Sequence, residues 1–179
     1  MPLDIAIGIF ISLFVTHAFS IHASALLVIL GIGAALFPDL DNVIPQWRRA
    51  PYDHRNVLHW PLAYIPLSLV VFLVFGNMYG TLFSLGVLWH LVHDTVGIGW
   101  GVTWLAPFSM RKFMFPESGR RREYGWFMTW LPDEEAAMAA KWHDPHWLRN
   151  WYFTPNWLVF TECVALVCSI IALAAYYLT

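Results

Sequence analysis

Long apolar runs separated by short polar connections dominate this sequence of 179 residues. A membrane-spanning helix needs about 20 mostly apolar residues, with a range of roughly 17–25. We expect five transmembrane helices, at residues 5–19, 23–37, 61–75, 81–96 and 157–178. The second run is rich in glycine and alanine, and small residues let membrane helices approach closely. The pattern therefore predicts an all-α fold, a polytopic membrane helical bundle of about five transmembrane helices.

Residues 98–156 lack such a run and are rich in tryptophan instead. Tryptophan collects at the membrane–water interface because its ring is apolar and its N–H needs a partner. Within this stretch, Pro132 followed by three acidic residues is typical of a helix start, and we expect that helix to end near Trp142. We interpret 98–156 as a Trp-rich interfacial cap on a single membrane domain, residues 1–179.

The composition supports a membrane protein. Hydrophobic residues make up 59% of the chain and charged residues 12%, against about 25% charged in a soluble domain. The net charge of −2 gives no reason to expect a nucleic acid partner, and membrane lipid is the partner we expect. Cys163 and Cys168 lie in an apolar run and are interpreted as ordinary membrane-helix residues.

The basic residues are confined to two segments of the chain, one between the second and third expected spans and the other between the fourth and fifth. Cytoplasmic loops carry an excess of Lys and Arg, so both segments should be cytoplasmic. With five spans, the N-terminus is then cytoplasmic and the C-terminus lies outside. The ten residues are Arg48, Arg49, Arg55, Arg111, Lys112, Arg120, Arg121, Arg122, Lys141 and Arg149.

Carboxylates and imidazoles gather near the expected cytoplasmic ends of these helices. Polar side chains inside a membrane span are expensive, so each is a functional candidate. The candidates are Asp4, Asp39, Asp41, His54, His59, His90, Asp94 and Glu162. His17 and His22 lie at the opposite end and are given no role. His143 and His146 are interpreted as surface residues of the cap.

The spacing of these candidates favours a metal site. His90 and Asp94 are four apart on one helix and share a face, whereas His93 points away from Asp94. Asp39 and Asp41 can both reach one site if the backbone there is extended or turn-like. Mixed His and carboxylate ligation suits Zn²⁺, Mn²⁺ or Fe²⁺. Each candidate also has a structural alternative: a helix cap, an interfacial loop residue or an interhelical hydrogen bond.

Three ordered motifs resemble the YdjM-like family, also described as LexA-binding, inner-membrane-associated hydrolases. They are Pro-Asp-Leu-Asp at 38–41, Asp-His-Arg-Asn-Val-Leu-His at 53–59 and His-Leu-Val-His-Asp at 90–94, followed by Trp-Leu-Ala-Pro at 104–107. The resemblance covers residues 34–108 best. It implies an inner (cytoplasmic) membrane location and a divalent metal cofactor, which we expect to be zinc. The metal-site residues that it implies are Asp39, Asp41, His54, His59, His90 and Asp94.

We therefore expect a metal-dependent hydrolase that acts at the cytoplasmic membrane face on a phosphoester or other ester of a lipid-like substrate. Asp41 or Glu162 would act as the general base, and Arg55 would clamp a phosphate. Two alternatives stay open. The chain can be a non-enzymatic membrane protein with a structural metal or ion-relay site, or a membrane-anchored binding partner that acts through the cap.

Overall fold

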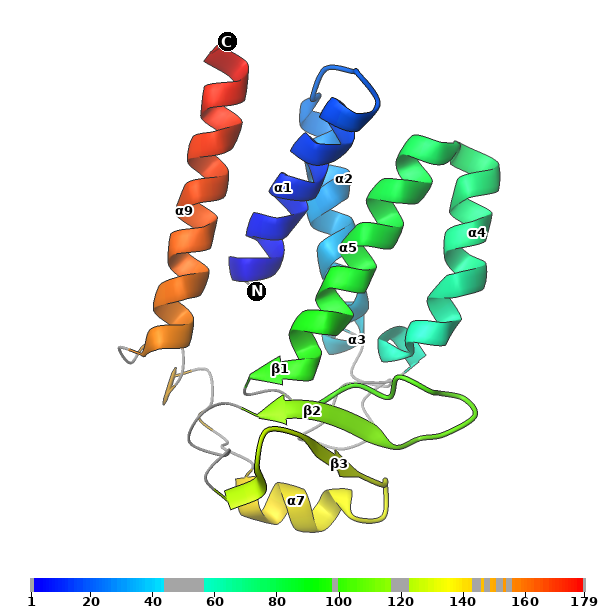
Figure 1. The fold of residues 1–179 in the computed structure, drawn as a ribbon, viewed down its shortest axis with the longest axis vertical. Coiled ribbons are helices and arrows are strands. Elements are labelled where there is room, and N and C mark those ends of the chain that lie inside the picture. The colour runs from blue at the N-terminus through cyan, green and yellow to red at the C-terminus, as the bar shows by residue number, and fades with distance from the viewer. Residues whose placement is uncertain are drawn as a thin grey trace. The chain divides into compact units, whose positions relative to one another are not determined.

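The computed structural model describes residues 2–43, 57–97, 100–116, 123–142, 146, 149–150, 153 and 156–178. Within them the chain is mostly helical and also contains three short strands (Figure 1). It divides into two compact units. One consists of Met1–Phe37, Ser68–Trp89 and His146–Thr179, and the other of Pro38–Leu67 and His90–Pro145.

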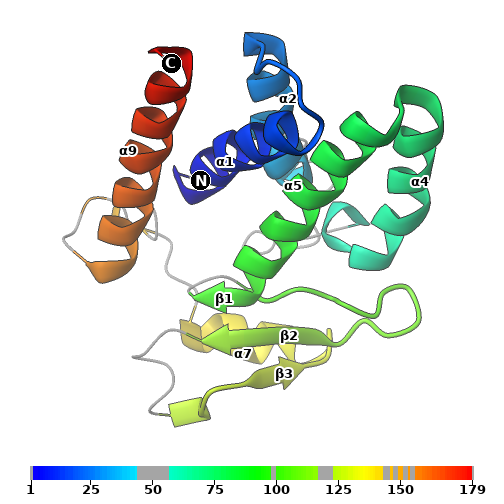
Figure 2. The same ribbon diagram turned by 45° about the horizontal axis from the view of Figure 1, so that its top comes forward.

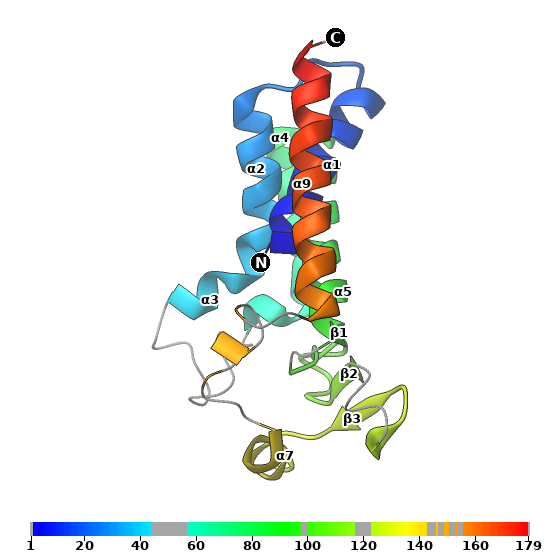
Figure 3. The ribbon, with the colours of Figure 1, turned by 90° about the vertical axis from the view of Figure 1, so that its left-hand side faces the viewer.

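The first unit is helical. It contains α1 (Pro2–Ala18), α2 (Ala25–Leu36), α9 (Trp157–Leu178) and most of α4 (Tyr64–Phe75) and α5 (Asn77–Thr95). Ser24 caps α2 by accepting a hydrogen bond from Leu27 N at 3.1 Å. Glycine lets α1 and α2 approach closely, since a Cβ on Gly8 would lie 2.6 Å from Ile32 Cα. The third view shows α9 running alongside α1 (Figure 3).

The second unit contains a small sheet covered by a helix. Its strands are β1 (Val96–Gly97), β2 (Lys112–Pro116) and β3 (Met128–Trp130), in the order β1-β2-β3, with β1 parallel and β3 antiparallel to β2. The helix α7 (Glu135–Trp142) lies along the strands (Figure 2). Its Met138 packs against the buried side chains of the sheet, which are Met114, Met128 and Trp130.

Short turns in the second unit precede and follow a segment that lies outside the described residues. A 3₁₀ turn at Phe37–Asp39 leads into α3 (Leu40–Val43), and two further 3₁₀ turns, Val57–His59 and Pro61–Ala63, lead into α4. The last turn of α5 also belongs to this unit. Together these pieces carry most of the polar candidates named by the sequence.

The predicted bundle of five transmembrane helices is wrong. Among the described residues, one helix, α9, is long and apolar enough to cross a membrane. The other apolar helices have 10–17 residues, and a 17-residue helix is only about 25 Å long against a hydrocarbon core of about 30 Å. The helix α5 has 19 residues, but its last two turns carry His90, His93 and Asp94. The sheet also overturns the all-α class.

One candidate span supports neither a multi-pass arrangement nor an orientation of the N-terminus. By contrast, the helix predicted to begin near Pro132 and end near Trp142 is present as α7. The view of the chain as a single membrane domain, with 98–156 as its cytoplasmic-side interfacial segment, stays a prediction. That stretch is not purely interfacial helix, because β2 and β3 fall within it.

Candidate metal centre

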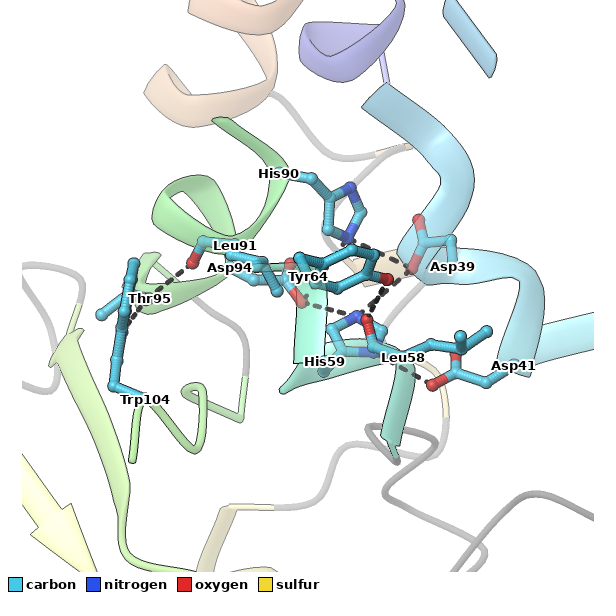
Figure 4. Close-up of polar contacts among 10 residues, drawn as sticks. All are labelled: Asp39, Asp41, Leu58, His59, Tyr64, His90, Leu91, Asp94, Thr95 and Trp104. Carbon is cyan, nitrogen blue, oxygen red and sulfur yellow. Dashed lines mark hydrogen bonds and ion pairs between the residues drawn. The ribbon is translucent and has the colours of Figure 1, made fainter. Parts of the chain in front are cut away.

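Three carboxylates of the second unit surround the imidazoles of His59 and His90 (Figure 4). They come from four short elements. Asp39 ends the 3₁₀ turn after α2, Asp41 lies in α3, His59 ends the turn Val57–His59, and His90 and Asp94 occupy the last turns of α5. His90 and Asp94 share a helix face because they are four residues apart. The chain thus brings together residues that are up to 55 positions apart in the sequence.

The Nε2 atoms of the two histidines lie at the centre of this cluster. His59 Nε2 is 4.0 Å from Asp39 Oδ1 and 3.2 Å from Asp94 Oδ2. His90 Nε2 is 3.7 Å and 3.9 Å from the same two oxygens. The ligand atoms of Asp39, His59 and His90 all lie within 4.8 Å of one another. Asp94 adds a fourth oxygen that approaches both imidazoles.

These distances fit a metal ion in the middle of the group. In a tetrahedral Zn²⁺ site with bonds of about 2.0–2.2 Å, ligand atoms are separated by about 3.3–3.6 Å. The four nitrogen–oxygen distances, 3.2–4.0 Å, fall around that range. Two imidazole nitrogens with carboxylate oxygens form a donor set that suits zinc, and also manganese or iron. Asp39, His59 and His90 can therefore hold a metal ion.

Burial adds an electrostatic reason for a cation at this position. His59 and His90 are 1% exposed and Asp41 is 0% exposed, while the side chains of Asp39 and Asp94 are 16% exposed. Three carboxylates thus surround two imidazoles with little access to water. Gathering like charges in such a place is unfavourable unless positive charge compensates it. A bound divalent cation would supply that compensation.

Asp41 contacts His59 from the side opposite to the other carboxylates. Its Oδ2 lies 3.0 Å from His59 Nδ1, whereas Asp39 and Asp94 face Nε2. Metal-binding histidines usually donate their second ring N–H to a carboxylate, which fixes the tautomer and the orientation of the ring. The Asp41 contact is of this kind, since Oδ2 lies within hydrogen-bond distance of His59 Nδ1.

Two further contacts hold the site in place and were not predicted from the sequence. The Tyr64 hydroxyl donates to the Leu58 carbonyl at 2.6 Å, next to His59. Burial, and then the charge of Asp41, raises the pKa of the Tyr64 phenol, so it remains a donor. Buried tyrosines usually find such a partner, and a tyrosine just after the His59 motif was therefore a usable sequence signal.

The second contact fixes the end of α5. Trp104 Nε1 donates to Thr95 Oγ1 at 2.9 Å, and Thr95 Oγ1 donates to the Leu91 carbonyl at 2.7 Å. Thr95 directly follows Asp94, so this chain of hydrogen bonds links the loop of Trp104 to the turn that carries Asp94 and His90 (Figure 4). Trp104 belongs to the sequence motif at 104–107. The sequence analysis gave this motif no structural role.

The other predicted site residues are Asp4, His54, Arg55 and Glu162. His54 and Arg55 lie outside the described residues. Glu162 lies on α9, and Asp4 is buried in α1; both belong to the other compact unit. His93 is not in the group of Asp39, His59 and His90 that can hold a metal ion. Roles for His54, Arg55 and Glu162 stay predictions.

Comparison with known proteins identifies the family. No curated protein and no solved structure matches the chain. A family model described as YdjM inner membrane protein matches residues 4–178, almost the whole sequence. This match includes every element that carries the candidate metal centre, together with α9. The chain therefore belongs to the YdjM inner membrane protein family.

Proposed function

We propose that this protein is a metal-dependent hydrolase of the inner membrane, with its metal held by Asp39, His59, His90 and Asp94. The observation that carries the proposal is the convergence of two histidine Nε2 atoms and two carboxylate oxygens within 3.2–4.0 Å. The mixed donor set favours zinc, with manganese or iron as the next choices. When bound, such an ion lowers the pKa of water and polarises a phosphoryl or acyl oxygen.

Residues that do not bind the metal have separate roles in this proposal. Asp41 holds the ring of His59 through Nδ1, and Tyr64 fixes the backbone before that ring. Arg55, which stands four residues before His59 in the sequence, would bind a phosphate of the substrate as a planar bidentate donor. Glu162 is proposed as a general base, because the Asp41 carboxylate is engaged with His59.

The site is proposed to face the cytoplasm. Two basic residues, Lys141 and Arg149, lie within 16 residues before the start of α9. Basic residues close to a span are retained on the cytoplasmic side. We therefore propose that the N-terminal end of α9 lies in the cytoplasm. The second unit, whose last segment precedes α9 in the sequence, would then be cytoplasmic as well.

The substrate proposed is an amphiphile whose ester or phosphoester bond is cleaved. A membrane protein whose reactive side chains are largely shielded from water is well suited to a molecule that keeps its tails in lipid. A phosphoester is the favoured class, because Arg55 belongs to the same motif as His59 and a guanidinium matches phosphate geometry.

Metal content and turnover, measured on the same purified samples, test this proposal. We expect stoichiometric transition metal in the parent protein, loss of the metal in Asp39→Ala and His90→Ala, and parent content in His17→Ala, whose side chain is exposed. A panel of phosphoesters and acyl esters, presented in bilayers, should be hydrolysed by the metal-loaded protein alone. If the metal is retained when both Asp39 and His90 are replaced, the assignment of the site fails.

A structural or ion-relay metal is the second candidate function. Asp39, His59 and His90 form a group that could hold a metal ion, and Asp94 lies close to both imidazoles, so its carboxylate as a fourth donor would close a tetrahedral site. X-ray absorption of the zinc-loaded protein separates the two functions, because a catalytic site keeps one position for water. Four protein donors without water, combined with no turnover of any ester in the panel, would favour the structural function.

A further inference from the structure

The two faces of the small sheet differ in what covers them. On β2, Lys112 and Met114 are buried, and α7 lies on this face through Met138. Side chains alternate between faces along a strand, so Phe113 and Phe115 point to the opposite face. Phe115 is 44% exposed, and Val96, its partner on β1, is 46% exposed. The sheet therefore presents apolar side chains to its surroundings on the face away from α7.

A third phenylalanine joins this exposed face. The Phe127 ring lies 5.2 Å from the ring of Phe115 and 6.1 Å from that of Phe113, centroid to centroid, and Phe127 is 49% exposed. Its neighbour Trp126 is 73% exposed. We name Phe113, Phe115 and Phe127 the aromatic sheet face. A contiguous exposed group of this kind marks an interaction site more often than isolated surface residues do.

The aromatic sheet face also carries a cation. Arg111 Nη1 donates to Thr129 Oγ1 at 3.0 Å, and Thr129 pairs with Phe113 in the ladder, on the same face. On the covered face, Glu135, the acidic residue of α7, pairs with Lys112. Phenylalanine and tryptophan beside an arginine match an anionic lipid surface, where apolar rings enter the headgroup layer and the cation meets phosphate.

The chain keeps this face close to a bilayer. The helix α9 is the candidate span of an inner membrane family, and 6% of its apolar window is buried within the protein. Fourteen residues, 143–156, connect α7 to α9. A connection of that length reaches at most roughly 50 Å. The bilayer surface is thus always present at high effective concentration, and weak contacts are sufficient for docking.

We propose that the aromatic sheet face docks on the membrane, with Phe113, Phe115 and Phe127 in the headgroup layer of a bilayer that contains anionic phospholipid. The docking holds the second unit against the membrane surface independently of the metal centre. A lipid surface is favoured over a second copy of the chain because Arg111 offers a cation to phosphate, while a symmetric pairing of this face would bring two copies of Arg111 together.

Site-directed nitroxide labelling of the full chain in nanodiscs tests the docking. In a background with Cys163 and Cys168 replaced by alanine, Phe115→Cys and Phe127→Cys report on the face, and Ala140→Cys, exposed on α7, is the matched control. In phosphatidylglycerol mixed with phosphatidylcholine, labels at 115 and 127 should collide several-fold more with oxygen and several-fold less with an aqueous nickel chelate than the label at 140. In pure phosphatidylcholine the contrast should shrink.

Other outcomes would overturn the proposal. Equal access of the nickel chelate to positions 115, 127 and 140 would show that the face meets water. Protection of 115 and 127 from both oxygen and chelate would show that protein covers the face, and dipolar broadening between labels would identify a second copy. Circular dichroism and thermal unfolding of the same samples verify that the labelled proteins are folded, which keeps this test separate from that of the metal centre.

Discussion

Asp41 Oδ2 lies 3.0 Å from His59 Nδ1, so the two carboxylates of the Pro-Asp-Leu-Asp motif contact opposite nitrogens of one imidazole. A neutral imidazole carries its proton on one nitrogen and a lone pair on the other. A carboxylate at Nδ1 favours the proton there, which leaves the lone pair of Nε2 directed at Asp39 and Asp94. The pair therefore prepares His59 to bind a metal ion through Nε2.

Replacing Asp41 should weaken metal binding without abolishing it. Partners that orient a metal-binding histidine typically contribute about 10–100-fold to metal affinity. Asp41→Asn retains an acceptor for the Nδ1 proton and should lie at the low end of that range, with Asp41→Ala at the high end. Competition with a chromogenic chelator measures both. An Asp41→Asn protein that loses the metal as completely as Asp39→Ala would instead identify Asp41 as a direct ligand.

The helical backbone at Asp39–Asp41 separates two carboxylates that the sequence analysis expected at one metal site. An extended or turn-like backbone would have let the two residues reach one point, but the structure has a 3₁₀ turn followed by α3. Two residues apart on a helix, side chains diverge by about 200°. Asp39 and Asp41 therefore approach His59 from different sides. By comparison, the i,i+4 spacing of His90 and Asp94 required only that α5 be helical.

The transmembrane count and the sheet were harder to obtain from the sequence. Apolar composition alone did not distinguish a spanning helix from α1, α2 or α4, because the length of the helix decides that question. The strands β1 and β3 have two and three residues, too few for an alternating pattern to emerge. Their pairing with β2 depends on contacts between distant parts of the chain, which local propensity does not encode.

Tyr64→Phe should also reduce metal affinity, by several-fold. The change removes the hydrogen bond to Leu58 O from a residue that is 6% exposed. A bond of this kind contributes about 1 kcal/mol to stability. The Leu58 carbonyl would be released beside His59, so the geometry of the metal site should loosen as well. Chelator competition and thermal unfolding, run on the same protein, measure the two effects.

Tyr176→Phe is the matched control for this experiment. The Tyr176 hydroxyl accepts a hydrogen bond from Ala23 N at 3.0 Å in the first unit. Its loss should lower the unfolding temperature while leaving metal affinity unchanged. If both Tyr→Phe proteins lose metal affinity to the same extent, the effect of Tyr64 would be one of general stability and not of positioning.

The orientation of α9 gives a prediction in intact cells. With Cys163 and Cys168 replaced, Leu178→Cys should react with a membrane-impermeant maleimide after the outer membrane is permeabilised, and Ala140→Cys should react only after lysis. The reason is the basic charge before α9, at Lys141 and Arg149. Labelling of Ala140→Cys from outside would reverse the proposed orientation and remove the metal centre from the cytoplasmic face.

Two ion pairs of the second unit should differ sharply in their effect on stability. Lys112 Nζ lies 2.6 Å from Glu135 Oε1, and the two side chains are 4% and 13% exposed. The side chains of Lys141 and Glu123 are 51% and 57% exposed. Their contact lowers the pKa of Glu123 and raises the pKa of Lys141. Its contribution is therefore lost as pH falls through the lowered pKa or rises through the raised one, and solvent keeps that contribution small.

Lys112→Met should destabilise the protein strongly, because it keeps the apolar stem but removes the cation that pairs with Glu135 in a mostly buried position. Breaking a buried pair in this way costs about 3–5 kcal/mol. Adding Glu135→Gln removes that charge and should recover a large part of the loss, since apolar or neutral replacements of buried pairs are often tolerated. Lys141→Met, the exposed control, should barely change the unfolding temperature. Thermal and urea unfolding, measured in the same detergent, compare the stability of the three proteins. If the double variant is no more stable than Lys112→Met, the packing of Lys112 beneath α7, and not its charge, stabilises the sheet.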